Sequence, residues 1–154
     1  MYQKLLTILL VGMLTACASS PQTEMGNFVQ TPVVAHEQKM VEDSVKKLLA
    51  LYPPATTKFE LQHIASDSFG VRLIESLRSK GYAIQEFIET PAPTANGAKP
   101  ASTQGLPLSY ILQQSKEDDD AYVLSFFIKQ QRLDRLYKVK AGAVLSAGYW
   151  ARKE

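Results

Sequence analysis

Two stretches of the chain carry apolar residues at helical spacing. The first follows Thr31-Pro32, a pair typical of an N-cap with proline at the first helical position. Its apolar side chains recur about every 3.6 residues; they are Val34, Val41, Val45, Leu48 and Leu49. This pattern predicts a helix that begins between Pro32 and Lys39 and ends before Pro53.

The second helical stretch lies between two runs of alternating polarity. Ser66 or Asp67 can cap this helix, and Gly81 can close it. Its inward residues are Phe69, Leu73, Ile74 and Leu77. Residues 57–64 alternate as a half-buried strand with His63 on the apolar side, and residues 82–88 predict the next strand. A strand, a helix and a strand with short turns predict a βα unit that leads to a neighbouring strand.

The C-terminal third reads as a series of strands. Residues 108–113 and 121–129 predict a hairpin around the acidic turn 117–120, and residues 136–140 and 143–151 add one or two strands around Gly142. The strand 121–129 is apolar on both faces: Val123 and Phe127 lie on one, and the other carries Tyr122, Leu124, Phe126 and Ile128. Such a strand is either central and covered or lies at a contact with another subunit.

Two polar segments complete the expected organisation. Residues 18–31 are rich in Ser, Pro, Gln and Thr without a hydrophobic period, which predicts a flexible tether. Residues 90–107 contain four prolines and Asn96-Gly97; a loop this long is either functional or disordered, and disorder is the interpretation we favour. The fold class expected is α+β, a small single domain at residues 32–154 with a helix, a strand, a helix, a strand and an antiparallel meander.

Composition narrows the function classes. With 154 residues, of which 45% are hydrophobic, the chain can form one domain with tails but not a multidomain enzyme. The formal net charge of +2 gives no field that would recruit nucleic acid over the whole surface, so no direct nucleic-acid binding is expected. A single cysteine excludes an intramolecular disulfide and a cysteine-based metal cluster.

That cysteine follows a short apolar run at the N-terminus. Residues 1–4 supply a positive charge at Lys4, and the run from Leu5 to Leu14 is too short to span a bilayer, which needs about 20 apolar residues. The run ends in Leu14-Thr15-Ala16-Cys17, which resembles the lipobox of bacterial lipoproteins. Residues 1–16 are therefore predicted to be a signal peptide and residues 17–31 a lipidated cysteine with its tether.

The lipobox resemblance implies a covalent anchor. It implies cleavage between Ala16 and Cys17, a diacylglycerol thioether on the Cys17 sulfur and an acyl chain such as palmitate on the freed amine. Several acyl chains together would hold a domain on the membrane permanently. Ala18 stands where retention in the inner membrane usually requires aspartate, so the outer membrane of a Gram-negative bacterium is expected. An ordinary cleaved signal or an uncleaved anchor remains the alternative.

The sequence offers little catalytic or metal-binding chemistry. The two histidines, His36 and His63, have no metal-ligand spacing, and no Gly-x-Ser-x-Gly motif accompanies His63. Residues 118–120 are three aspartates that lack the rest of a calcium loop, which favours a solvated turn. The basic stretch 129–140 could contact phosphate, but the interruption by Asp134 favours a solvated strand face. Neither a catalytic site, nor a metal site, nor a cofactor other than the lipid on Cys17 is expected.

The C-terminus instead suggests a contact surface. Residues 149–153 place a bulky aromatic pair beside two cations, and Trp, Tyr and Arg dominate interface energetics, although a single Trp in a small domain is as often part of the core. Together with the strand 121–128, this end of the chain gives the candidate partner-binding residues, which are Tyr122, Phe127, Tyr149, Trp150 and Arg152.

Several of these features together resemble one family. The lipobox, the tether, the run Leu-Pro-Leu-Ser-Tyr-Ile-Leu at 106–112 and the aromatic and basic ending at 135–153 are similar to TrbH, a family of small lipoproteins of plasmid conjugation systems. The resemblance implies a non-catalytic part in mating-pair formation by a type IV secretion apparatus. It also implies other apparatus proteins as partners, assembly into a ring among them, at the periplasmic side of the outer membrane. Cys17 is the only functional residue that the resemblance carries over.

Two other interpretations remain open. The chain could be a different lipoprotein, either one that pilots a secretin or one that acts in surface exclusion. It could also be a periplasmic hydrolase that uses His63.

Overall fold

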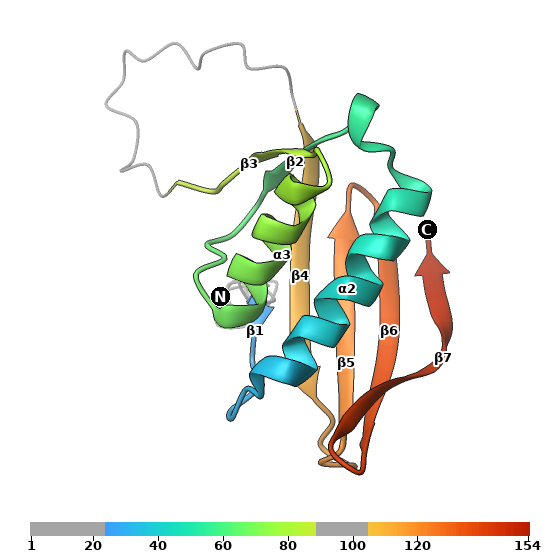
Figure 1. The fold of residues 1–154 in the computed structure, drawn as a ribbon. Helices are drawn as coiled ribbons and strands as arrows, with labels where there is room; N and C mark the ends of the chain where they lie inside the picture. Colours follow the sequence, from blue (N-terminus) through green and yellow to red (C-terminus); the bar gives the residue numbers. More distant parts are fainter. Residues whose placement is uncertain (1–23, 89–104) are drawn as a thin grey trace, which may run out of the picture.

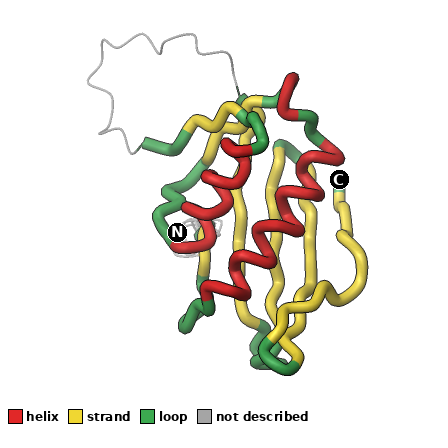
Figure 2. The backbone as a smooth tube through the Cα atoms, in the orientation of Figure 1, coloured by secondary structure: helices red, strands yellow, loops and turns green. Residues whose placement is uncertain are grey.

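Two helices pack across one face of a seven-stranded sheet in the computed structural model, which describes residues 24–88 and 105–154 (Figures 1 and 2). The helices are α2 (Val34–Leu51) and α3 (Ser68–Ser79), with a 3₁₀ turn at Pro54–Thr56. The strands are β1 (Gly26–Asn27), β2 (Lys58–Leu61), β3 (Ala83–Gln85), β4 (Leu106–Gln114), β5 (Ala121–Ile128), β6 (Gln131–Lys140) and β7 (Ala143–Lys153).

The sheet combines a parallel half with an antiparallel half. Its order is β3-β2-β4-β5-β6-β7, with β1 pairing to β4 beside β2. β1 and β2 both run parallel to β4, and β3 runs parallel to β2, whereas β4 to β7 form an antiparallel meander. The expected α+β class and the βα unit β2-α3-β3 are therefore confirmed.

The core lies between the helices and the sheet. From the helices it takes the apolar residues at the predicted spacing, such as Val45 and Leu48 of α2 and Leu73 and Leu77 of α3. From the sheet it takes alternate residues of each long strand, such as Tyr110. The fully buried side chains of largest volume are Tyr110, Tyr137, Phe59, Phe69 and Phe126.

The two helices begin differently from one another. The prediction that Thr31 caps the first helix was wrong: the N-cap is Val33, which makes no side-chain cap bond, and its carbonyl accepts from the backbone N–H groups of His36 and Glu37. Asp67 caps α3 as predicted, because its side chain accepts from the Gly70 N–H at 2.9 Å. Gly81, with φ +89°, closes α3 in the left-handed conformation expected of a C′ residue.

Some boundaries differ from the sequence pattern. β1 lies inside the predicted tether 17–31, because Gly26 and Asn27 pair with Ile111 and Leu112 of β4. The predicted loop 90–107 extends too far, since β4 begins at Leu106 through parallel pairing with β2. The strand expected at 82–88 is reduced to Ala83–Gln85. The remainder of the loop and residues 18–23 lie outside the described residues.

β5 occupies the centre of the meander. Both of its edges are paired, and its Leu124, Phe126 and Ile128 are buried beneath the helices. Val123 and Phe127 point to the opposite face, which no described helix covers (Figure 1), and both are half-buried there by neighbouring strands. The apolar pattern on both faces thus belongs to a central strand that is covered on one side.

Candidate functional site

The last strand carries a bulge that contains its two adjacent aromatic residues, Tyr149 and Trp150. Asp134 of β6 pairs with Ala151 of β7, and Leu136 pairs with Ala147. One residue of β6, Arg135, therefore faces three residues of β7, which are 148–150. Gly148 has a φ of +88°, a conformation that glycine adopts without the penalty of a Cβ. The glycine lets the strand bend at this point.

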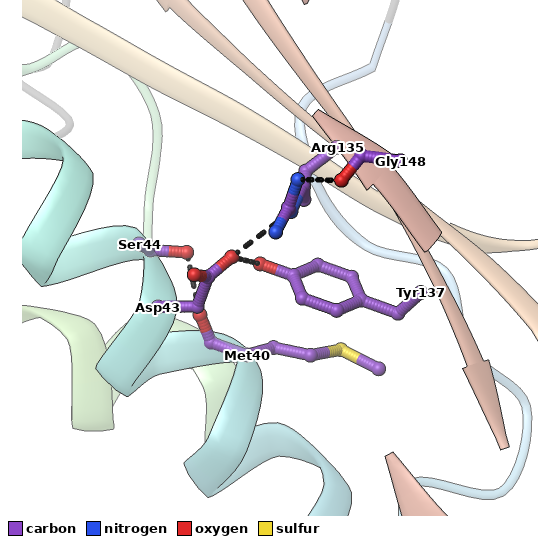
Figure 3. Close-up of polar contacts among 6 residues, drawn as sticks. All are labelled: Met40, Asp43, Ser44, Arg135, Tyr137 and Gly148. Atoms are coloured by element: carbon purple, nitrogen blue, oxygen red, sulfur yellow. Dashed lines mark hydrogen bonds and ion pairs between the residues drawn. The ribbon is translucent and has the colours of Figure 1, made fainter. Parts of the chain in front are cut away.

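The side chain of Arg135 forms hydrogen bonds both to this bulge and to helix α2 (Figure 3). Its Nε donates to Asp43 Oδ2 at 3.1 Å, and its Nη1 donates to the Gly148 carbonyl at 2.5 Å. The Tyr137 hydroxyl donates to the same Asp43 oxygen at 2.9 Å. Because the Arg135 side chain is only 10% exposed, these contacts satisfy a charge that burial would otherwise penalise. The network joins α2, β6 and β7.

Burial and the charges of this network change the pKa of Tyr137. Burial raises the pKa of its phenol, and the negative charge of Asp43 raises it further, while Arg135 opposes the shift. Tyr137 is therefore a neutral hydrogen-bond donor that helps hold Asp43 in place. These contacts stabilise the fold, because a buried hydroxyl donor is paired with a carboxylate that a guanidinium also holds in place.

The aromatic pair divides between core and surface. The Trp150 ring stacks on Phe126 with centroids 6.1 Å apart, and the guanidinium carbon of Arg135 lies 5.7 Å from the Trp150 ring. Trp150 is thus half-buried against the core. Tyr149, by contrast, is 95% exposed. Because successive residues of a strand point to opposite faces, Trp150 points toward the core and Tyr149 toward solvent.

The other partner-binding candidates lie elsewhere on the molecule. Tyr122 is half-buried on the helix side of β5, edge-on to His36 at 6.4 Å. Phe127 lies on the opposite face beneath Arg132, whose guanidinium carbon is 5.5 Å from the ring. Arg152 is nearly half-exposed and pairs with Glu154 at 2.8 Å. The structure therefore brings Trp150 together with Arg135 and Phe126 rather than with Tyr122 or Phe127.

β7 forms one edge of the sheet. Among residues 24–88 and 105–154, no strand pairs with its outer side. The strand contains no acidic residue and ends in Arg152 and Lys153. Leu145 and Tyr149 of this strand are 50% and 95% exposed. This edge offers unpaired backbone groups, apolar side chains and positive charge together.

The histidine considered for hydrolysis lies in a different environment. His63 follows the end of β2 and packs edge-on against Tyr110, with ring centroids 4.7 Å apart. Both of its ring nitrogens are buried without a hydrogen-bond partner, and burial lowers its pKa while the charge of Asp67 opposes the shift. Asp67 itself accepts from the Tyr110 hydroxyl and from the N-terminus of α3. In this arrangement His63 is oriented by packing and not by a carboxylate.

Sequence reasoning missed a second buried polar cluster near the N-terminus. Glu37 is 3% exposed, and its Oε1 accepts from Asn27 at 2.7 Å and from Ser68 at 2.8 Å. The cluster joins β1, α2 and α3. A signal was present, because Glu37 precedes the buried positions Met40 and Val41 by three and four residues and so shares their helix face.

Two further ion pairs involve the basic stretch of β6. Arg132 pairs with Asp134 of the same strand at 2.7 Å, and Lys138 pairs with Asp118 of the acidic turn before β5 at 2.8 Å. Across the described part of the chain, no group of three or more His, Cys, Asp or Glu residues is placed to hold a metal ion.

The proposed anchor lies outside the described residues. Ala16 and Cys17 belong to residues 1–23, which precede the described part of the chain. None of the helices in the described ranges has both the length and the apolar character needed to cross a membrane.

Comparison with known proteins identifies a family. The searches of curated proteins and of solved structures gave no match. The family described as conjugal transfer protein TrbH matches residues 22–154, a range that includes every helix and strand of the described residues. This match covers most of the chain, so the chain belongs to the TrbH family of conjugal transfer proteins.

Proposed function

We propose that this protein is an outer-membrane lipoprotein that serves as a non-catalytic assembly subunit of a conjugative type IV secretion apparatus. Membership of a conjugal transfer family supports the process, and the lipobox ending at Cys17 supports the anchor. The observation that carries the assembly role is the edge strand β7, whose outer side is paired by no strand of the described residues and which carries the exposed Tyr149.

The chemistry of this edge favours docking by strand addition. An extended segment of a partner can hydrogen-bond to an unpaired strand edge, with side-chain pockets supplying specificity. The outer edge of β7 is interrupted at the bulge, so residues 143–147 offer the longest regular ladder. Because β7 carries Arg152 and Lys153 and no acidic residue, the favoured partner is an apparatus protein with an acidic extended segment.

The candidates on β5 take a smaller part in this proposal. β5 is paired on both edges, so a partner strand cannot be added to it. We therefore place the contact at Tyr149, Leu145 and Arg152, with Trp150 as the residue that supports the bulge from beneath.

Two substitutions separate docking from folding. Tyr149→Ser removes a side chain that is 95% exposed and should leave thermal unfolding unchanged while it weakens copurification of the apparatus partner from conjugating cells. Trp150→Ala removes a ring stacked on Phe126 and should lower the free energy of unfolding by about 2 to 3 kcal/mol. If Tyr149→Ser retains full copurification and full transfer, docking through this edge is wrong.

The anchor has its own test. Cys17→Ser should abolish incorporation of radiolabelled palmitate and release the protein from the outer-membrane fraction. Ala18→Asp is the matched control: it should keep the label but redirect the protein to the inner membrane. An unlabelled wild-type protein would contradict the lipoprotein assignment.

A mating experiment separates assembly from surface exclusion. An assembly subunit is needed in the donor, so deletion in the donor should reduce plasmid transfer, and expression in the recipient alone should have no effect. A surface-exclusion protein would instead lower transfer into the recipients that carry it.

A further inference from the structure

A cavity of about 920 Å³ opens at the end of the sheet where β5 turns into β6. Its walls come from the end of α2, the segment that enters β2, the start of β4 and the β5–β6 turn. Leu106 and Ile128 supply an apolar floor, and Tyr52 closes one side, held by a bond from its hydroxyl to Gln131 at 3.0 Å. This volume is within the usual range of small-molecule sites, roughly 300 to 1,000 Å³.

The charged residues of the lining are both cations. Lys58 enters from the start of β2 and Lys129 from the turn, and neither forms an ion pair with a described residue. No carboxylate belongs to the lining that the structure describes. Arg132, Arg135 and Lys138 of β6 each have a carboxylate partner, whereas the exposed Lys140 at the end of that strand, like the two lining lysines, forms no ion pair with a described residue. The cavity therefore concentrates positive charge that the protein does not itself neutralise.

The backbone at Lys129 adds a second observation. Lys129 lies in a two-residue turn between the paired residues Ile128 and Gln131, with a φ of +55°. Glycine is the residue that favours this conformation, and hairpin turns usually place Gly, Asn or Asp there. The chain accepts backbone strain to hold a lysine at the cavity. Strain of this kind concentrates at functional positions.

We propose that this cavity binds a phosphate group, with Lys58 and Lys129 as its cationic ligands and the floor of Leu106 and Ile128 against the molecule that carries it. Two lysines from separate elements act as point charges, and lysine is a common phosphate ligand in this role. The phosphate can come from a lipid headgroup or from a soluble phosphate compound.

The test uses the full chain purified in a neutral detergent and followed by backbone amide NMR. Inorganic phosphate is titrated in one arm, and micelles doped with phosphatidylglycerol or phosphatidylcholine are used in the other. Phosphate should shift the amides of residues 57–58 and 128–131. Lys58→Gln and Lys129→Gly should each weaken this binding about tenfold, the effect expected of losing one charged hydrogen bond.

The controls keep a loss of binding distinct from a loss of fold. Lys129→Gly should raise the melting temperature, since it removes the left-handed strain, even as it weakens binding. Lys140→Gln changes an exposed lysine at the opposite end of β6 and should leave phosphate binding unchanged.

Each outcome bears on the proposal. Shifts with phosphate and with phosphatidylglycerol, but not with phosphatidylcholine, support a lipid headgroup as the source, and shifts with phosphate alone support a soluble compound. An absence of shifts at the cavity in both arms overturns the proposal. So does phosphate binding that both lysine substitutions leave intact.

Discussion

Arg135 is the residue on which the shape of the C-terminal strand depends. It bonds to Asp43 and to the Gly148 carbonyl, and it lies over the Trp150 ring. Arg135→Ala should lower the free energy of unfolding by about 2 to 3 kcal/mol, somewhat less than for a fully buried pair because the Asp43 side chain is 26% exposed. Urea unfolding measures this. Arg152→Ala, which removes a surface pair, should cost less than about 1 kcal/mol, and equal losses for the two would contradict the assignment.

The burial of His63 should make the free energy of unfolding depend on pH in mild acid. Burial lowers its pKa below the usual value of 6.5, so below that pH the unfolded chain takes up a proton that the folded chain does not. The stabilising contribution is therefore complete above pH 6.5 and is lost as the pH falls through the folded pKa. Between pH 6.5 and 5.5 the free energy of unfolding should fall by at most about 1 kcal/mol, because the unfolded imidazole is only half protonated at pH 6.5, and His63→Gln should flatten this slope. Parallel slopes for the two proteins would show that another group is responsible.

At the scale of the element, the effect of the β7 bulge on docking can be distinguished from the effect of glycine backbone strain on stability by comparing Gly148 with Gly142. Gly148 and Gly142 have φ values of +88° and +76°, and neither has an atom within 4 Å of an added Cβ. Alanine at either position should cost about 1 to 2 kcal/mol through the backbone alone. Only Gly148→Ala should also weaken partner copurification, because only this glycine lies in the bulge that presents Tyr149. Copurification with each variant, at a temperature where both are folded, measures the difference.

The elements themselves were largely predictable because local patterns and tertiary contacts agree. The spacing in α2 and α3, the Asp67 cap and the turn at Gly142 all act within a few residues, and the structure confirms them. β1 could not be predicted, since its two residues have no pattern of their own and are held by Leu112 and Glu37 from distant parts of the chain. The start of β4 at Leu106 was missed for the same reason: parallel pairing with β2 overrides the proline signal at Pro107.

The candidate site was predictable in composition but not in arrangement. The sequence singles out the aromatic and basic ending, yet it gives Tyr149 and Trp150 equivalent roles. Alternation along the strand puts these two residues on opposite faces, but which of them points inward depends on the pairing register of β6 with β7, which leaves no local signal. The bond from Arg135 to Gly148 leaves none either. Asp43, which completes the network, lies 92 residues away from Arg135 in the sequence.

At the scale of the whole molecule, the junction between the proposed anchor and the domain is decided by β1. Any tension on the N-terminal segment enters the domain at β1, which is held by two backbone pairs to β4, by the bond from the Phe28 N–H to Leu112 and by the Asn27 bond to Glu37. Asn27→Ala removes that side-chain bond and leaves a buried Glu37 oxygen with one partner fewer, which should cost about 1 to 3 kcal/mol.

The stability lost in Asn27→Ala should affect the segment around β1 first and the rest of the domain less. Hydrogen exchange in residues 24–33 should accelerate in Asn27→Ala, while the core strands β5 and β6 keep their protection, because no residue of β1 belongs to the apolar core between the helices and the sheet. Gln30→Ala, an exposed change three residues away, is the matched control and should leave exchange as in the wild type. Equal acceleration across the sheet would mean that β1 unfolds together with the core, so that the proposed anchor would be joined directly to the cooperative unit. Acceleration confined to residues 24–33 would mean that β1 unfolds separately and connects the proposed membrane attachment to a domain that stays folded up to the proposed docking edge at β7.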